Sequence, residues 1–321
     1  MIVSRTPLRV SFCGGGTDLE AYYSTSQEGG CVTSVALNKY VYVTVNSRFD
    51  ESVRVSYSEM EIVDDFEKLN HQLVKEAMRM TGVTKGVEIT TIADIPSKGS
   101  GLGSSSAVTV GLLNALHCFA GRKPTPEQLA EQACEIEINI LGQTIGKQDQ
   151  YAVAYGGCNH IIFNKNGTVV VEKIPNQLKL KDNFSLIYTG ITRLANDILK
   201  DQNSRTNNNR SNLDLLVIQA KTAKKLILEE NFSGLAKLLD ETWKCKKELS
   251  PSISNEEIDL MFKKLFDCGT QGAKLLGAGG GGFILFEGKN DVSQKVRTIF
   301  SGNKIIPLEI DYTGSCILYS D

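Results

Sequence analysis

The sequence predicts an α+β protein made of two domains. The chain has 321 residues, which exceeds the usual size of one compact hydrophobic core. Stretches rich in β-branched residues are mixed with stretches whose apolar residues recur at helical spacing. A change of composition near 176–183 is the best candidate for a linker. We therefore expect one domain at 1–180 and a second at 181–321.

In the N-terminal half, four segments carry a clear pattern. The segments 40–45 and 86–92 are rich in β-branched residues and are predicted to be strands. In 106–119, apolar residues recur every three or four positions, which is typical of a helix packed on one face. The segment 129–141 repeats this spacing and predicts a second helix.

The C-terminal half continues the mixture. The segment 213–228 is predicted to be a helix from its apolar spacing. A further helix is predicted at 254–266, because Ser254 and Glu257 have the spacing of a capping box. The asparagine-rich segment 203–212 has little to bury and is predicted to be a surface loop.

Composition and charge exclude several classes of partner. The chain is 41% hydrophobic and 22% charged, as in ordinary globular proteins. Its 35 Lys and Arg residues against 37 Asp and Glu residues leave a formal charge of −2. This balance gives no electrostatic reason to expect a nucleic-acid or anionic-membrane partner. Any anion must then be held by local geometry.

Cysteine and histidine usage indicates a reducing compartment and no zinc site. No two of the eight cysteines form a CxxC pair. The three histidines, His71, His117 and His160, have no spacing typical of metal ligands and are expected to be structural. Scattered cysteines in a chain of this length fit reduced, mostly buried thiols. We therefore expect a cytoplasmic protein.

Neither a leader peptide nor a membrane span is predicted. Arg5 and Arg9 interrupt the apolar core that a signal peptide needs. The longest uncharged stretch, 99–121, begins with GSGLGSSS and contains Asn114 and His117. Such polar residues do not suit a membrane-spanning helix, and the stretch is interpreted as a loop that leads into a helix.

A glycine- and serine-rich loop is the most informative motif. Residues 95–107 read IPSKGSGLGSSSA, between a predicted strand and a predicted helix. In this context backbone N–H groups converge on a phosphate, glycines allow close approach, and serine hydroxyls add donors or a magnesium ligand. The P-loop pattern GxxxxGK[ST] is absent. By itself, the motif could also be a flexible turn before a helix with a serine N-cap.

Two further glycine-rich segments lie toward the two ends of the chain. Residues 5–18 read RTPLRVSFCGGGTD, which predicts a strand with two arginines that ends beside an exposed backbone. An edge strand and a tight turn would explain it equally well. Residues 274–284 read KLLGAGGGGFI, which indicates close backbone packing between apolar runs. Alone, this segment would be a buried hairpin.

Together, in this order, the three segments resemble the GHMP kinase superfamily of small-molecule kinases. The resemblance extends from Arg5 to about Phe286, and the loop at 96–107 is its most specific part. It implies a ribosomal protein S5 domain 2-like N-terminal domain that binds ATP and a ferredoxin-like C-terminal domain. ATP and the substrate would lie in the cleft between them. The phosphate-binding residues implied are Lys98, Gly99, Ser100, Gly101, Leu102, Gly103, Ser104, Ser105 and Ser106.

The resemblance also implies the catalytic residues. The segment 146–151, GKQDQY, is similar to the segment that carries the catalytic aspartate of the family, which assigns this role to Asp149. Arg9 matches an arginine beside that aspartate in galactokinase-like members. A carboxylate near the acceptor hydroxyl would orient it and accept its proton. The alternatives are a purely electrostatic role, or a solvated loop aspartate beside Lys147.

Magnesium would be held by Ser105 and Glu137, as the resemblance implies. A carboxylate, a hydroxyl, phosphates and water suit the preference of Mg²⁺ for oxygen ligands. Ser104 and Glu135 are the neighbouring residues that would take these roles if the alignment with the family were shifted. Alternatively, Glu137 is an exposed charge on an amphipathic helix.

The substrate residues implied are Gly15, Gly16, Thr17, Asp18, Arg193, Gly279 and Gly280. Galactokinases carry GEH where this chain has Gly14 to Gly16, so two polar side chains are missing and a bulkier sugar than galactose is expected. Arg193, in YTGITR, is a candidate for binding a phosphate of the substrate, because a guanidinium suits phosphate oxygens. It is equally well a surface arginine at a helix start.

Within the superfamily, RTPLRVSFCGGGTDLEAYY and GKQDQYAVAYGG look closest to D-glycero-D-manno-heptose 7-phosphate kinases. The expected reaction is phosphorylation of the anomeric hydroxyl by ATP, for nucleotide-activated heptose and surface polysaccharide. The alternatives are another sugar 1-kinase, for fucose or galactose, and a nucleotide-binding regulator without turnover. The sequence makes no prediction of oligomeric state.

Overall fold

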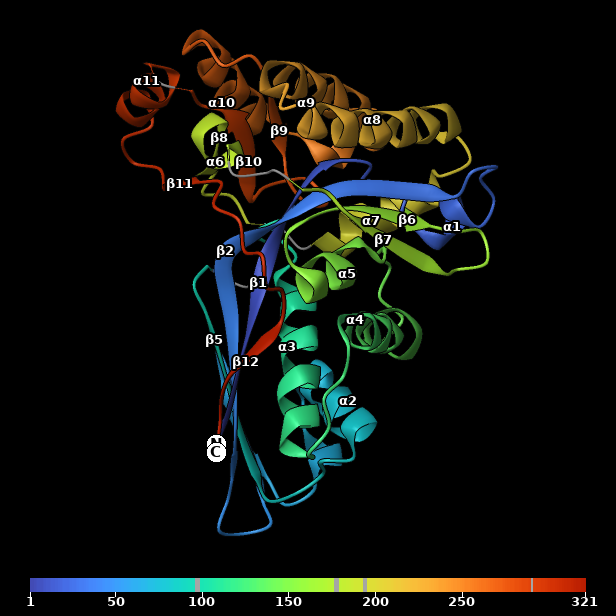
Figure 1. Ribbon diagram of the computed structural model, residues 1–321, viewed down its shortest axis with the longest axis vertical. Coiled ribbons are helices and arrows are strands. Elements are labelled where there is room, and N and C mark those ends of the chain that lie inside the picture. Colours follow the sequence, from blue (N-terminus) through green and yellow to red (C-terminus); the bar gives the residue numbers. More distant parts are fainter. Residues whose placement is uncertain (96–98, 176–178, 193–194, 290) are drawn as a thin grey trace.

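The structure of the chain is a computed structural model. It describes residues 1–95, 99–175, 179–192, 195–289 and 291–321. Two β-sheets with helices packed on them form the molecule, one built mainly from the N-terminal half and one from the C-terminal half (Figure 1). This confirms the predicted α+β fold class.

The first sheet is organised around two long antiparallel strands, β1 (Ile2–Cys13) and β2 (Gly30–Ser47). In the described part of the chain it contains eight strands, in the order β12-β1-β2-β5-β3-β4, with β6 on β2 and β7 on β6. The other strands are β3 (Val53–Ser56), β4 (Met60–Val63), β5 (Val87–Ala93), β6 (Cys158–Phe163), β7 (Val169–Lys173) and β12 (Cys316–Ser320).

Helices cover the first sheet and carry much of the N-terminal core. The central one is α3 (Ser104–Phe119), which packs on β1 and β2 and is buried along most of its length. Next to it lie α2 (Gln72–Thr81), α4 (Pro126–Cys134), the π-helix Glu135–Ile140 and α5 (Gln148–Tyr155), while the 3₁₀ turn Phe66–Lys68 contacts α2. The short α1 (Glu20–Tyr23) lies away from α3, in the segment between β1 and β2. Because α3 starts at the glycine-rich loop, its buried body fixes the position of that loop.

The second sheet is antiparallel, in the order β11-β8-β10-β9. Its strands are β8 (Phe184–Tyr188), β9 (Ala273–Leu275), β10 (Phe283–Glu287) and β11 (Ile305–Pro307). The helices of this half are α6 (Leu180–Asn183), α7 (Ala195–Ser204), α8 (Arg210–Leu228), α9 (Phe232–Lys247), the 3₁₀ turn Pro251–Ile253, α10 (Glu256–Asp267) and α11 (Asp291–Ile299). Of these, α8 packs on α9 and on β1 and β2 of the first sheet. The β8–helices–β9–β10–α11–β11 succession is the ferredoxin-like order.

The end of the chain returns to the first sheet. After β11, Leu37 and Ile310 form a bridge, and β12 pairs with the outer edge of β1. Asp321 then lies against the N-terminal amino group, so the two termini are side by side (Figure 1). The domain boundary near residue 180 stays a prediction. The last strand, β12, belongs to the first sheet although it comes from the C-terminal end of the chain.

The predicted N-terminal elements are found with shifted ends. The strands at 40–45 and 86–92 lie within β2 and β5, and the helix at 106–119 is α3. The helix at 129–141 differs. It begins earlier, where Thr125 caps α4 in a capping box with Gln128, and from Glu135 it continues as a π-helix. The spacing of apolar residues does not reveal such a π turn, because a π-helix has no characteristic residue type.

Two C-terminal predictions are corrected. The predicted capping box of Ser254 and Glu257 is wrong, because Asn255 caps α10 by accepting a bond from the Ile258 N–H, and Ser254 bonds to Asp259 instead. The asparagine-rich segment 203–212 is a turn only in its middle, since its ends belong to α7 and α8. The helix predicted at 213–228 is α8.

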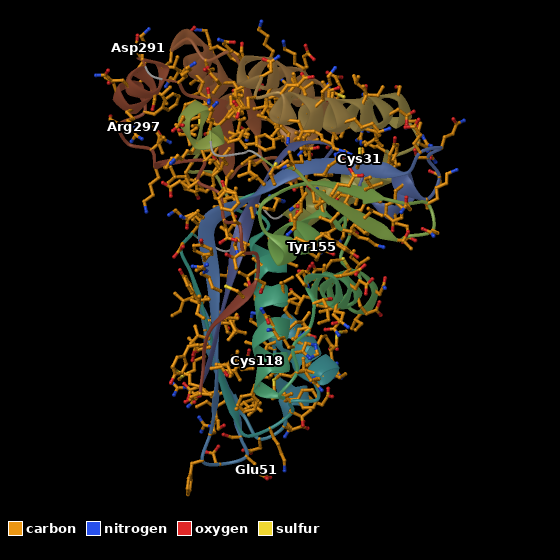
Figure 2. The ribbon with its side chains drawn as sticks, viewed as in Figure 1. Cys31, Glu51, Cys118, Tyr155, Asp291 and Arg297 are labelled. Carbon is orange, nitrogen blue, oxygen red and sulfur yellow. The ribbon has the colours of Figure 1, made fainter. Side chains whose placement is uncertain are left out.

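Cysteines are scattered through the structure, as the sequence predicted. All eight lie in the described residues and none of them is in a disulfide. Cys31 and Cys118, for example, lie in distant parts of the molecule (Figure 2). Among the helices that the structure describes, none is long and apolar enough to cross a membrane.

Candidate active site

A cavity of about 500 Å³ opens where the two halves of the chain meet. Its walls come from β1 and the loop after it, the glycine- and serine-rich loop, the start of α5, α7, the end of α9 and the turn between β9 and β10. The three glycine-rich segments that the sequence singled out therefore line one cavity. They are brought together although more than 250 residues of sequence separate the first from the last.

The glycine- and serine-rich loop is a cradle at the N-terminus of α3. Gly99, Gly101 and Gly103 have φ angles of 71°, 73° and 73°, in the left-handed region that favours glycine. The Ser100 and Ser104 hydroxyls lie 2.9 Å apart, and Ser100 also accepts a bond from the Leu102 N–H. The loop thus presents hydroxyl and backbone donors at the positive end of a long helix. Lys98 lies outside the described residues.

The turn between β9 and β10 packs directly on this loop. A Cβ atom on Gly101 would lie 2.6 Å from the Leu276 carbonyl oxygen, and one on Gly277 would lie 2.5 Å from the Gly101 Cα. The Phe283 N–H donates to the Ser100 carbonyl at 3.2 Å. Only glycines allow the two backbones to approach this closely. The predicted close backbone packing of the C-terminal glycine segment is therefore found, and its neighbour is the phosphate-type loop.

Within this turn, the residues on the cavity wall differ from the two singled out by sequence. Gly277 and Ala278 line the cavity. Gly279 lies against Ile253, and the Gly280 N–H donates to the Ile253 carbonyl. The assignment of Gly279 and Gly280 to substrate binding stays a prediction.

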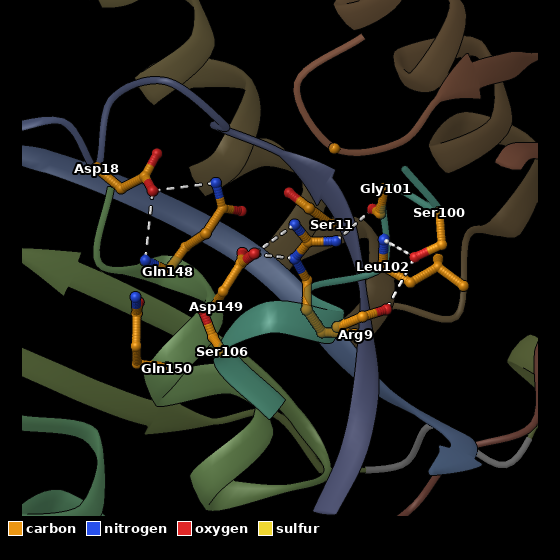
Figure 3. A network of polar contacts seen from close by, with 12 residues as sticks. Arg9, Ser11, Asp18, Ser100, Gly101, Leu102, Ser106, Gln148, Asp149 and Gln150 are labelled. Atoms are coloured by element: carbon orange, nitrogen blue, oxygen red, sulfur yellow. Dashed lines mark hydrogen bonds and ion pairs between the residues drawn. The ribbon is translucent and has the colours of Figure 1, made fainter. Parts of the chain in front are cut away.

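Arg9 and Asp149 form a two-point ion pair on the cavity wall (Figure 3). The Arg9 Nε lies 2.7 Å from Asp149 Oδ1 and its Nη2 lies 2.8 Å from Oδ2, while Nη1 donates to the Gly101 carbonyl at 2.6 Å. Arg9 is 4% exposed, whereas the Asp149 side chain is 23% exposed. The arginine fixes the carboxylate beside the loop and leaves it accessible to a ligand.

Asp18 is a second carboxylate at the cavity, held by its own loop and by α5. Its oxygens accept bonds from the Gly16 N–H at 2.8 Å and from the Gln148 side chain at 3.1 Å. Burial raises the pKa of Asp18, and the bonds from the backbone N–H groups of Gly16 and Gln148 lower it. Gly15 and Gly16 line the cavity beside it, but the Thr17 hydroxyl donates to backbone carbonyls and does not face the cavity wall.

Glu137 lies below the loop and its carboxylate is fully buried. The π-helix turns it toward α3, where it accepts bonds from Ser105 at 3.2 Å, Ser106 at 2.8 Å and Thr109 at 3.0 Å. The Gln150 amide adds a fourth bond at 2.5 Å. Burial raises the pKa of Glu137, and these donors counteract the increase. Ser105 is exposed at the cavity, whereas Ser106 is buried and points at Glu137.

The structure therefore brings Ser105 and Glu137 together. Glu135, the alternative carboxylate two residues earlier, is exposed and bonds to Asn139. In the described residues no group of three or more His, Cys, Asp or Glu side chains could hold a metal by itself. One hydroxyl and one carboxylate fit a magnesium ion whose other ligands are phosphates and water.

Three of the polar cavity residues that the sequence did not single out are Gln148, Gln202 and Lys246. The Gln148 Oε1 and the Gln202 Nε2 atoms are buried and have no hydrogen-bond partner in the described part of the protein. Lys246, from α9, also lines the cavity. Gln148 adjoins Asp149 within the GKQDQY motif, so the sequence did contain a signal for it. Gln202 and Lys246 are far from any motif, and no pattern in the sequence marks them.

A second hollow of about 560 Å³ adjoins the first, because Gln143 lines both. Its walls include apolar and aromatic side chains from β2, α2, β5, α3 and the segments next to them, namely Val41, Tyr57, Leu73, Ile92, Val108 and Leu141. Such a hollow suits a flat, largely apolar ring system.

The fold and the cavity define a class of protein, a small-molecule phosphotransferase, and comparisons with known proteins identify the family. The family model described as GHMP kinases N terminal domain matches residues 69–157, and that described as GHMP kinases C terminal matches 223–302. The D-glycero-alpha-D-manno-heptose 7-phosphate kinase of Campylobacter jejuni is 32% identical over 89% of this chain and 88% of its own length. The chain belongs to the GHMP kinases.

Other relatives support the same assignment. The L-fucokinase/L-fucose-1-P guanylyltransferase of Bacteroides fragilis is 28% identical over 94% of this chain, which spans 36% of that longer protein. The crystal structure of a D-glycero-D-manno-heptose 1-phosphate kinase from Bacteroides thetaiotaomicron has the same fold, with a TM-score of 0.81 over the full length of both chains at 24% identity. This chain is a sugar kinase, an ATP-dependent phosphotransferase that acts on a sugar hydroxyl.

Proposed function

We propose that this kinase phosphorylates the anomeric hydroxyl of D-glycero-D-manno-heptose 7-phosphate, with the 1,7-bisphosphate as product. The observation that carries the proposal is the 32% identity, over nearly the whole chain, with a kinase of that name. The product would feed nucleotide-activated heptose for surface polysaccharide. Because the reaction consumes ATP and the cysteines are unbridged, we place the enzyme in the cytoplasm.

The proposed roles follow from the geometry of the cavity wall. Asp149 orients the sugar hydroxyl and accepts its proton as the new phosphorus–oxygen bond forms. Arg9 holds the Asp149 carboxylate in place through its two bonds. The loop at 99–106 holds the phosphates of ATP through its hydroxyls and the N-terminus of α3. The hollow next to Gln143 receives the adenine ring.

Mg²⁺ would be held by Ser105 and Glu137, since a hydroxyl and a carboxylate oxygen 3.2 Å apart match its preferred ligands. When bound, the ion would neutralise charge on the phosphates. The Glu137 carboxylate accepts four bonds, and release of the one from Ser105 would free an Oε1 lone pair for the ion. The exposed Ser105 is the donor that can turn toward the ion, while Ser106, Thr109 and Gln150 keep the carboxylate in place.

The sugar would bind beside Gly15 and Gly16, with its hydroxyls on Asp18, Gln148 and Gln202. These side chains offer acceptors and donors in a buried setting, and unpaired buried amide atoms favour a polar ligand there. Thr17 and the glycines Gly279 and Gly280 would support the site from behind. The missing side chains at Gly14 to Gly16 leave room for a heptose.

The phosphate already on the acceptor needs a cation. Arg193 remains the candidate from the sequence, and it lies outside the described residues. Loss of a charge-assisted phosphate contact typically costs a few kcal/mol, or about a hundredfold in affinity. We therefore expect Arg193→Ala to raise KM for the heptose 7-phosphate strongly and to change KM for ATP little.

A second candidate acceptor is L-fucose, favoured by the match to a fucokinase over 94% of this chain. Measurement of ATP consumption over a panel of heptose 7-phosphate, unphosphorylated heptose, fucose and galactose separates the candidates. The proposal expects the highest kcat/KM with heptose 7-phosphate and little turnover without the 7-phosphate. Equal use of phosphorylated and unphosphorylated heptose would overturn it, and no turnover with any sugar would favour a regulator.

A further inference from the structure

Helix α9 ends in three lysines that differ in their surroundings. Lys244 pairs with Asp240 at 2.6 Å, and Lys247 pairs with Asp259 at 3.6 Å. Both of these pairs lie toward the surface. Lys246, between them, turns inward and is only 5% exposed. A lysine is rarely buried to this extent unless it has a partner.

Lys246 lines the cavity, and its ammonium group has no carboxylate partner in the described part of the chain. It lines the cavity together with Arg9 and Asp149, and it donates to the Gly277 carbonyl oxygen. A carbonyl does not neutralise the charge. Burial therefore lowers the pKa of Lys246 well below its ordinary value, and the cations Lys274 and Arg9 lower it further, while Asp18 and Asp149 oppose the shift. An anion in the cavity would restore the charged form.

Lys274 shows that burial alone does not make such a site. It is also buried, and it donates to the Ser11 carbonyl at 2.7 Å, with a pKa lowered by burial to about 8. Unlike Lys246, it is absent from the cavity wall. Lys274 therefore ties β9 to β1, whereas Lys246 lines the cavity.

The location of Lys246 indicates which anion it meets. Its partner Gly277 packs on Gly101 of the phosphate-type loop. The charged residues Arg9, Asp18 and Asp149 line the same cavity as Lys246 and are close enough to affect its pKa. Lys246 thus shares the cavity wall with the loop that would hold the phosphates of ATP and with the carboxylate that would face the sugar hydroxyl.

We propose that Lys246 is a catalytic residue that binds the phosphoryl group while it passes from ATP to the sugar. The inference rests on the proposed roles of Asp149 and the loop. The sugar oxygen bonds to the γ-phosphorus, and the bond from this phosphorus to the oxygen it shares with ADP breaks, with its electron pair leaving on ADP. The hydroxyl proton passes to Asp149. Lys246 keeps its proton and donates hydrogen bonds to the phosphoryl oxygens.

Two variants separate a charge from a structural role. Lys246→Met removes the charge and the donor, and Lys246→Gln keeps a donor that can reach toward the Gly277 carbonyl. We expect both to lower kcat about a hundredfold to a thousandfold, as when one fixed donor to a transition state is lost. KM for ATP should change little. Lys247→Met, one residue further along α9, is the matched control and should retain wild-type kcat.

A binding measurement tests the same point without turnover. The probes are ADP with Mg²⁺, alone or with aluminium fluoride and the acceptor sugar, titrated by calorimetry. The wild type should bind the fluoride complex much more tightly than ADP alone, and both Lys246 variants should lose this gain while they bind ADP normally. Thermal unfolding checks that both variants are folded.

The outcomes distinguish this inference from the acceptor assignment. The assays use whichever sugar the wild type phosphorylates best, so a wrong acceptor leaves the test intact. Normal kcat in both Lys246 variants would overturn the inference. Rescue by Gln but not by Met would show that the lysine only holds Gly277, which would also overturn it. A loss confined to KM for a phosphorylated sugar would mean that Lys246 binds the phosphate of the acceptor instead.

Discussion

At the scale of single residues, the candidate site depends on side chains whose partners come from distant parts of the chain. Arg9 would be an unpaired buried cation without Asp149, which follows it by 140 residues. Glu137 would be a costly buried carboxylate without its four donors. The fold supplies these partners, and the same partners aim the side chains at the cavity or at its edge.

The first prediction concerns Asp149. We expect Asp149→Asn to lower kcat by about 10²–10⁴-fold, because the amide cannot accept the proton and carries no charge. Binding of ATP, measured by calorimetry, should be nearly unchanged. Asp267→Asn, at an exposed position of α10, is the control. Turnover close to wild type at saturating substrates would show that another group has this role.

The second prediction concerns the metal residues. Ser105→Ala and Glu137→Gln should each weaken Mn²⁺ binding in the presence of ADP by at least about tenfold, measured by paramagnetic resonance. Glu135→Gln removes a carboxylate of the same helical segment that is exposed, and it should have no effect. The opposite result, a loss with Glu135→Gln only, would move the metal assignment by two residues.

The third prediction is a pH dependence that arises from His160. This histidine is 3% exposed, its Nδ1 lies 2.9 Å from the Thr33 hydroxyl, and burial lowers its pKa from 6.5 to about 4, with Lys224 adding repulsion. Between these values the unfolded chain binds the proton and the folded chain does not. Stability should therefore fall as pH decreases from about 6.5 toward about 4.

The size of this effect follows from the shift in pKa. His160 can contribute up to about 3 kcal/mol to the fall in the free energy of unfolding. His160→Gln should reduce the fall by a similar amount, whatever its effect at neutral pH. Urea unfolding at a series of pH values measures both slopes. Parallel curves for the two proteins would show that His160 does not stay neutral in the folded state.

At the scale of elements, the site depends on the close approach of two glycine-rich segments. The loop before α3 and the turn between β9 and β10 meet at Gly101 and Gly277, where side chains would not fit. The π-helix Glu135–Ile140 is the other decisive element, because its wider turn directs Glu137 into α3. Wide turns of this kind are frequent at functional sites.

The fourth prediction tests the contact between the two glycine segments. Gly101 and Gly121 have the same φ of 73°, but a Cβ atom on Gly101 meets the Leu276 carbonyl at 2.6 Å and one on Gly121 meets nothing within 4 Å. An alanine should cost roughly 1–2 kcal/mol at either site through backbone strain. Gly101→Ala should lose clearly more stability than Gly121→Ala in urea unfolding, and it alone should raise KM for ATP. Equal effects would mean that the loop can move away from the turn at no cost.

At the scale of the whole molecule, the last strand joins the two halves. The chain leaves the second sheet after β11 and ends as β12 on the edge of β1, so the first strand has a partner on both sides. Arg9, which lines the cavity, lies on this same strand, and Gly15 and Gly16 lie in the loop that follows it. The position of β1 thus couples the stability of the first sheet to the geometry of the site.

The fifth prediction is that removal of residues 316–321 will destabilise the whole first sheet. The truncation would leave the outer edge of β1 unpaired, and an open edge favours association with other chains. We expect a lower Tm by thermal unfolding and increased light scattering on warming. Removal of Asp321 alone leaves β12 intact and serves as the control. An unchanged Tm in the longer truncation would show that β12 contributes little.

The sequence by itself determined the fold class, most of the main elements and the motifs of the site. Periodic apolar residues predicted α3 and α8, and the three glycine-rich segments carry an unusual composition that points to close backbone packing. Asp149, Arg9, Ser105 and Glu137 were named from motif resemblance, and the structure brings them into the two pairs expected. Local patterns suffice for such features because they depend on spacing along the chain.

Only the tertiary structure decided which residues share the cavity and what each one faces. Lys244, Lys246 and Lys247 look alike in the sequence, and the packing of α9 alone turns one of them inward. The π turn at Glu137 and the inward-facing Gln202 likewise leave no local signal. Burial, and with it the cost of an unpaired charge, depends on contacts between distant segments, so chemistry that arises from burial is decided by the fold.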